Sequence, residues 1–90
     1  MNFEVDPQLL LSQVGDLVQQ NENLARISEE LRECYNTAHS AWTSDYQAFK
    51  SYFEQLDQNI NDLKNLIAAI TSLSAHLRNH AYEAMRNAGN

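Results

Sequence analysis

The chain has 90 residues, 43% of them hydrophobic, and its 12 acidic and 6 basic residues give a formal net charge of −6. This charge opposes binding to nucleic acid and to anionic lipid, and a single cysteine excludes both an intramolecular disulfide and a cysteine-based zinc site. Two glycines and one proline are few turn residues, so we expect one domain over residues 1–90, built from few, long elements.

A first helix is predicted over about residues 7–40, after a loose arm. Asp6 can accept hydrogen bonds from the free N–H groups of a helix start, and Pro7 suits the first helical position. A series of residues then recurs at alternating spacings of four and three, which is the heptad signature of a helical seam. The series is Leu10, Val14, Leu17, Asn21, Leu24, Ser28, Leu31, Tyr35 and Ala38.

A second helix is predicted over about residues 45–86, after a turn at about 41–44. Thr43 or Ser44 can cap this helix, and Asp45 suits the positive end of its dipole. The heptad spacing resumes at once, through Tyr46, Phe49, Phe53, Leu56, Ile60, Leu63, Ile67, Ile70, Ser74, Leu77, Ala81 and Ala84. Residues 78–90 are polar, and we expect them to overhang the first helix and to fray.

The short turn predicts that the two helices pack antiparallel, as an all-α helix-turn-helix hairpin. Aromatic residues gather at the turn, where we expect Trp42 to cover the end of the seam above a wall of Tyr35, Tyr46, Phe49 and Phe53. The expected hairpin core is Leu17, Leu24, Leu31, Tyr35, Phe49, Phe53, Leu56, Ile60, Leu63, Ile67 and Ile70.

Two paired helices bury only the strips that face each other, and the apolar stripe of this chain is wider than one strip. We therefore expect a second hairpin, from an identical or a different chain, to complete a four-helix bundle. The candidates for this dimer interface are Leu11, Val18, Leu66 and Leu73.

Several other functions lack the residues that they need. The sequence shows no nucleophile paired with a base, no glycine-rich phosphate loop and no converging carboxylates, so we expect neither an enzyme nor a cofactor. His76, His80 and Glu83 share a helical face but are interpreted as an exposed polar face, with no metal site. The N-terminus has neither the basic region nor the cleavage site of a Sec signal peptide, and no apolar stretch is long enough to insert into a membrane.

The segment AWTSDYQAFKSYFEQL around the turn resembles the WXG (Trp-Xaa-Gly, ESAT-like) family of small type VII secretion substrates and partners. Trp42, Thr43 and Ser44 fall on the three motif positions, with Ser44 where the family usually has glycine. The resemblance extends from about Asp6 to Arg86. It implies a helical hairpin that forms a homodimer, or a heterodimer with a related hairpin protein, and that acts by protein–protein interaction.

The resemblance also implies a protein made in the cytoplasm of a Gram-positive or mycobacterial host, then secreted or associated with the cell envelope. Its further partners would be the type VII secretion ATPase or an effector toxin. Members of the family often carry a tyrosine followed four residues later by an acid as part of the export signal, whereas Tyr82 here is followed by Arg86. The export-tail candidates are Tyr82, Glu83 and Arg86.

Two alternatives to a secreted substrate or co-secreted partner stay open. The chain would in one case be a targeting chaperone or adaptor for a larger, LXG-type toxin of the same secretion system. In the other it would be a structural coiled-coil subunit of an unrelated complex.

Overall fold

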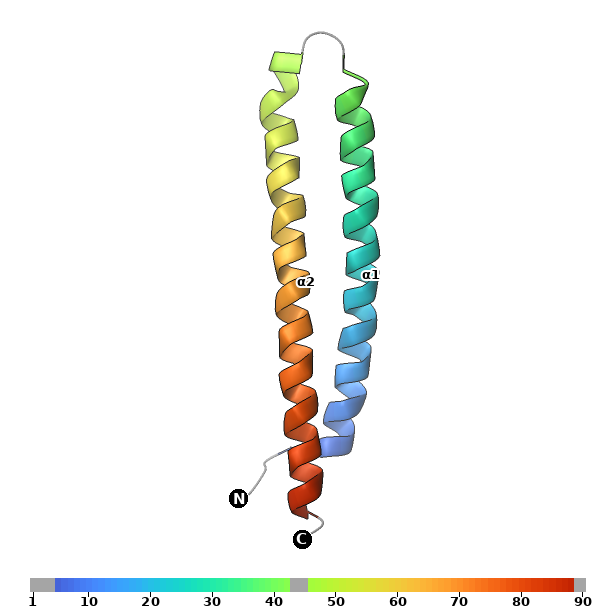
Figure 1. Cartoon of the computed structure of the whole chain (residues 1–90), viewed down its shortest axis with the longest axis vertical. Helices are drawn as coiled ribbons and strands as arrows, with labels where there is room; N and C mark the ends of the chain where they lie inside the picture. Colours follow the sequence, from blue (N-terminus) through green and yellow to red (C-terminus); the bar gives the residue numbers. More distant parts are fainter. Residues whose placement is uncertain (1–4, 43–45, 89–90) are drawn as a thin grey trace. The chain divides into compact units, whose positions relative to one another are not determined.

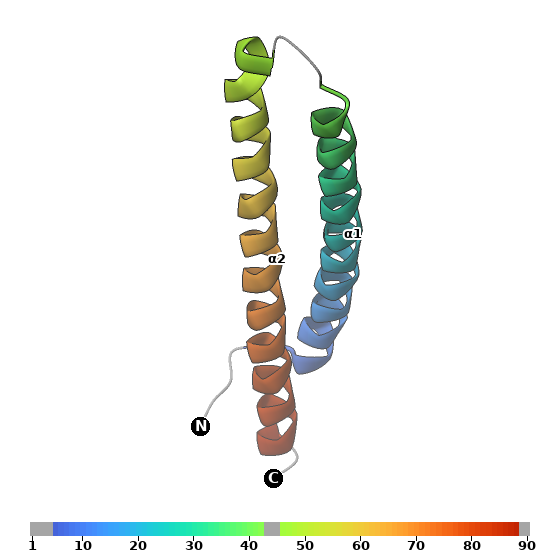
Figure 2. The same ribbon diagram turned by 45° about the horizontal axis from the view of Figure 1, so that its top comes forward.

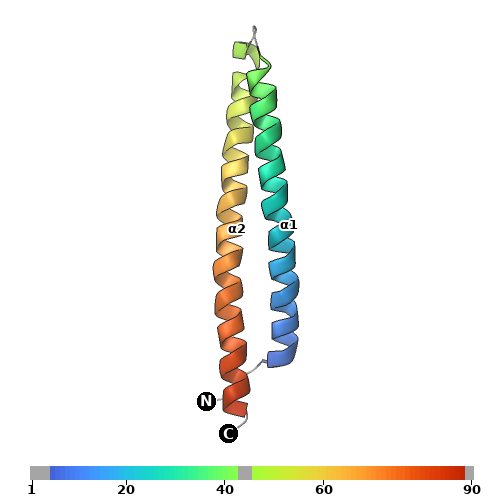
Figure 3. The same cartoon turned by 45° about the vertical axis from the view of Figure 1, so that its right-hand side comes forward.

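The computed structural model describes residues 5–42 and 46–88, which form two α-helices, α1 (Pro7–Ser40) and α2 (Tyr46–Ala88). The described residues contain no strand. The two helices run side by side in opposite directions (Figure 1), and two further views show the same pairing (Figures 2 and 3). The predicted all-α helical hairpin is confirmed.

The start of α1 is fixed by the predicted cap. The Asp6 carboxylate oxygen Oδ1 accepts hydrogen bonds from the backbone N–H groups of Gln8, at 3.1 Å, and Leu9, at 3.2 Å. These two donors would otherwise lack a partner in the first helical turn. Thr43 and Ser44, the predicted caps of α2, lie outside the described residues.

The last part of α2 agrees with the predicted helix. Residues 78–88 belong to α2, and the expected fraying of this segment stays a prediction. Ala81 and Ala84 are both buried, because they continue the heptad spacing with side chains small enough to pack closely. The polar residues of this segment lie on its solvent-exposed faces.

Contacts between the helices divide the chain into two compact units. The terminal unit contains residues 1–22 and 68–90, and the turn unit contains residues 23–67. In each unit a segment of α1 packs against a segment of α2.

The buried side chains share mainly one heptad position. We letter the seven positions of each heptad a to g, with Val14 at a in α1 and Ile60 at a in α2. The buried residues at position a are Val14, Asn21, Ser74 and Ala81 in the terminal unit and Ser28 and Ile60 in the turn unit. In a helix of 3.6 residues per turn, position d lies about 60° to one side of a, and position e about 40° to the other. The seam is therefore centred on a.

This orientation corrects three members of the predicted hairpin core. Leu31, Phe49 and Leu56 all occupy position d and are 38%, 46% and 37% exposed, so in the hairpin alone these three lie at the edge of the seam. Ile60 is buried, as predicted. The other predicted core residues are partly buried: Leu17, Leu24, Tyr35, Phe53, Leu63, Ile67 and Ile70.

Candidate interaction surface

One edge of the turn unit is closed by polar contacts between the helices. Arg32 and Asp57 both occupy position e, and the Arg32 Nη1 atom donates to the Asp57 Oδ1 atom at 2.7 Å. The Arg32 guanidinium also lies 5.0 Å from the centre of the Tyr35 ring, within the range of a cation–π contact. These contacts show that the e positions of the two helices meet at this edge.

The opposite edge of the turn unit is apolar and open. Positions d and g lie on the far side of a from e in both helices, so the ion pair at e places them together on this second edge. Six large apolar side chains at d and g are exposed to solvent there. We call them the apolar face: Ile27, Leu31, Phe49, Tyr52, Leu56 and Leu66.

The apolar face contains a shallow groove beside the turn. Its volume is about 290 Å³ and its lining comprises Trp42, Phe49, Tyr52, Phe53 and Leu56. The exposed Tyr52 ring and the Phe49 ring lie 6.2 Å apart. A groove lined by rings and an aliphatic side chain suits an apolar side chain of another helix.

The predicted aromatic cluster is present at the turn end of the seam. The Trp42 ring lies 4.9 Å from the Phe49 ring and 5.9 Å from the Phe53 ring, between ring centres. Tyr35 and Tyr46 contact Phe53 at 5.7 and 5.8 Å. Tilted and edge-on pairs at such distances are the favourable arrangements of aromatic rings.

The cluster includes His39, which the sequence interpretation left out. The His39 ring stacks on Tyr35, with ring centres 5.7 Å apart, and its Nε2 atom lies 3.2 Å from the Tyr46 hydroxyl oxygen. The signal was present in the sequence, because residues four apart on a helix are neighbours and His39 follows Tyr35 by four.

The four predicted dimer-interface residues occupy two different heptad positions. Leu66 in the turn unit and Leu73 in the terminal unit occupy position g, and both are exposed. Leu11 and Val18 occupy position e and are partly buried, on the side of α1 that faces away from d and g. The apolar stripe is widened on both sides of the seam, and only its d and g side is largely open.

On the e side of the terminal unit, a polar contact joins the helices. The Asn21 Nδ2 atom donates to the Thr71 hydroxyl oxygen at 3.0 Å. Val18 and Ser74 help to line a groove around these residues. Asn21, predicted to lie on the seam, therefore contacts the other helix through a polar pairing.

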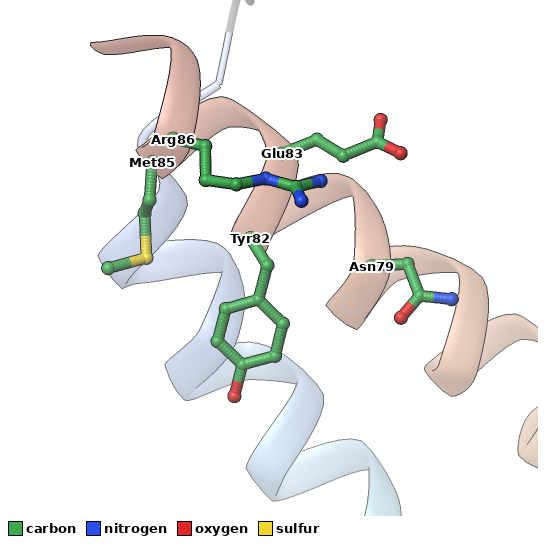
Figure 4. A pocket seen from close by; sticks show the side chains of 5 residues that line it. All are labelled: Asn79, Tyr82, Glu83, Met85 and Arg86. Atoms are coloured by element: carbon green, nitrogen blue, oxygen red, sulfur yellow. The ribbon is translucent and has the colours of Figure 1, made fainter. Parts of the chain in front are cut away.

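The export-tail candidates lie on the outer turns of α2. Tyr82, Glu83 and Arg86 are exposed and line an open groove with Asn79 and Met85. All five side chains come from one helix, and Tyr82 and Glu83 extend from it in different directions (Figure 4). These side chains form an exposed surface of α2.

The histidines of α2 do not mark a metal centre in the part of the chain that is described. The His76 Nδ1 atom lies 2.7 Å from the Ser72 carbonyl oxygen. Within residues 5–42 and 46–88, no group of three or more His, Cys, Asp or Glu side chains could hold a metal ion. Neither helix of the described residues has the length and apolar character needed to cross a membrane.

Comparisons with protein-family models, curated proteins and solved structures gave no match to this chain. The candidate site is therefore defined by its own geometry. It is an open apolar face with an aromatic groove, opposite a polar edge, and such a surface can bind another helical protein.

Proposed function

We propose that this protein works by protein–protein interaction, and that a second helical hairpin packs on the apolar face to form a four-helix bundle. The observation that carries this proposal is the group of six large, exposed apolar side chains on one edge of the turn unit. Fully burying one such side chain contributes about 1.5–3 kcal/mol, and contiguous exposed apolar patches on soluble proteins commonly mark interaction sites.

We further propose that the protein is a WXG-like substrate or co-secreted partner of type VII secretion. The support is the Trp42-Thr43-Ser44 motif together with a helical hairpin of this length. In this proposal the protein is made in the cytoplasm and leaves the cell with its partner hairpin. The acid that is missing four residues after Tyr82 would be supplied by that partner.

The secretion proposal is tested by expressing the chain in a Gram-positive host with an active type VII system and in a matched strain without its ATPase. We expect export that depends on the ATPase and is lost in Trp42→Ala. Trp42→Phe is the matched control, because a phenylalanine ring can keep contact with Phe49 and Phe53. Tyr82→Ala tests the tail without removing the buried alanines of α2.

Equal export from the two strains would contradict the type VII assignment. Normal export of both Trp42→Ala and Tyr82→Ala would contradict the roles given to the turn and the tail. Neither result would affect the proposed pairing of hairpins, which is tested separately by measuring association of the purified chain.

A further inference from the structure

The apolar face is bordered by acidic residues. Position c follows g around each helix, at about 40° further from the seam. In the turn unit, Glu30 occupies position c of α1 and Asp62 position c of α2, and both are exposed. We call these two residues the acidic border. The other c positions of the turn unit are uncharged: Asn23, Thr37, Ala48 and Gln55.

The basic residues are all placed elsewhere on the helices. Every one of the six Lys and Arg residues occupies position e or f, so none lies at position d, g or c. These residues are Arg26, Arg32, Lys50, Lys64, Arg78 and Arg86. Positions d and g hold no Asp, Glu, Lys or Arg in either helix. The charges are therefore segregated at position c, which carries acids and no Lys or Arg, whereas positions e and f carry both signs.

This segregation bears on what can cover the apolar face. When two helical surfaces pack, the charged residues at the edges of the contact select the partner, and like charges that meet there disfavour it. A second copy of this chain would bring its own c positions to the contact. In the turn unit those positions carry two acids and no Lys or Arg, so a copy that packs through the same face brings no Lys or Arg at position c to Glu30 or Asp62.

We infer that the occupant of the apolar face is a different helical chain, whose own apolar stripe is flanked by Lys or Arg, and that a second copy is selected against. This inference rests on the proposed function, because it specifies the partner of the same face. Burial of the apolar side chains supplies most of the affinity, and the border charges determine which chain is chosen.

The test uses a charge-reversed copy of this chain as the basic partner. The probe variant carries Glu30→Lys and Asp62→Lys, and association is measured at pH 8 and low salt by sedimentation equilibrium. We expect the mixture of native chain and probe to form a heterodimer with a dissociation constant at least about tenfold lower than that of native self-association. High salt should reduce this difference, because it screens exposed charges.

A matched control separates the position of the charges from net charge. The variant with Glu29→Lys and Glu54→Lys has the same formal charge as the probe, but its changes are at position b, away from the apolar face. The two variants are also balanced in local contacts, since Asp62 accepts from Gln58 and Glu54 lies near Lys50 within the same helix. We expect the control to pair with the native chain no better than a second native chain does.

A neutral variant, Glu30→Gln with Asp62→Asn, gives a second measurement that does not depend on lysines at these sites. We expect it to self-associate more tightly than the native chain. Three results would overturn the inference: native self-association as tight as the mixture, equal pairing by the control, or no gain in the neutral variant. Absence of all association at any concentration would instead contradict the proposed function itself.

Discussion

The Arg32 Nη1 atom lies 2.7 Å from the Asp57 Oδ1 atom, and this ion pair joins α1 to α2 at the polar edge of the turn unit. The Arg32 and Asp57 side chains are 25% and 45% exposed, so solvent screens their attraction. The pair marks the edge at which the e positions of the two helices meet, and the d and g positions lie on the opposite, open edge.

The Arg32 and Asp57 side chains should show a modest energetic coupling. A double-mutant cycle with Arg32→Ala and Asp57→Ala is expected to give about 0.5–1 kcal/mol in the free energy of unfolding, and less at high salt. The measurement is urea unfolding followed by circular dichroism. Lys50 and Glu54 are the control, because they are 3.9 Å apart and more exposed. An equal coupling for both pairs would contradict the role given to Arg32.

Replacing Gly15 by alanine should stabilise the chain. Gly15 lies inside α1 and is exposed, and no atom beyond its own local backbone lies within 4 Å of the place where a Cβ would be. Alanine removes the conformational entropy cost of a helical glycine, so we expect a gain of about 0.5–1 kcal/mol in thermal or urea unfolding. Gln19→Ala, at another exposed position of α1, is the control and should change stability far less.

Two buried serines should lower the stability of the chain relative to alanine. Ser28 in the turn unit and Ser74 in the terminal unit are buried at position a, and neither hydroxyl oxygen has a hydrogen-bond partner among the described residues. Ser28→Ala and Ser74→Ala each remove an unsatisfied polar group and raise helix propensity, which should stabilise by about 0.5–1.5 kcal/mol. The exposed Ser51→Ala is the control for propensity alone. A loss of stability in both variants would show that the hydroxyls are satisfied in solution.

The elements of the fold could be predicted because their signals are local. The heptad spacing predicted both helices, and Asp6 with Pro7 predicted the first residue of α1. The position of the seam was harder to predict. The heptad spacing alone predicted equal burial at positions a and d. In the structure Ser28 and Ser74 at a are buried, whereas Leu31, a larger apolar residue at d, is exposed.

The candidate site was only partly predictable, for a related reason. The sequence indicated that apolar side chains remain uncovered, but it did not show which edge of the hairpin they occupy. That depends on a contact between distant residues, the Arg32 and Asp57 ion pair, and its partners can be recognised only once the helices are placed in register. Val18 and Leu73 were therefore predicted together, although within the terminal unit they occupy positions e and g, on opposite sides of the seam.

The variants Ile60→Ala and Leu66→Ala should differ in stability, because Ile60 belongs to the core and Leu66 to the proposed interface. Ile60 is 1% exposed at position a, so its truncation leaves a cavity in the seam and should cost about 2–4 kcal/mol in the free energy of unfolding. Leu66 is 50% exposed at position g. Its truncation should change the stability of the isolated chain by less than about 0.5 kcal/mol, because solvent already reaches the side chain and alanine favours the helix.

The same two variants should differ in association. Leu66→Ala should weaken binding of the charge-reversed partner by about 1–2 kcal/mol, or roughly tenfold, because it removes apolar surface from the proposed contact. Tyr82→Ala is the matched control, since Tyr82 is 51% exposed but occupies position b, away from d and g. Equal weakening by Leu66→Ala and Tyr82→Ala would mean that association is a general property of exposed apolar side chains. Weakening by Leu66→Ala alone would locate binding on the apolar face.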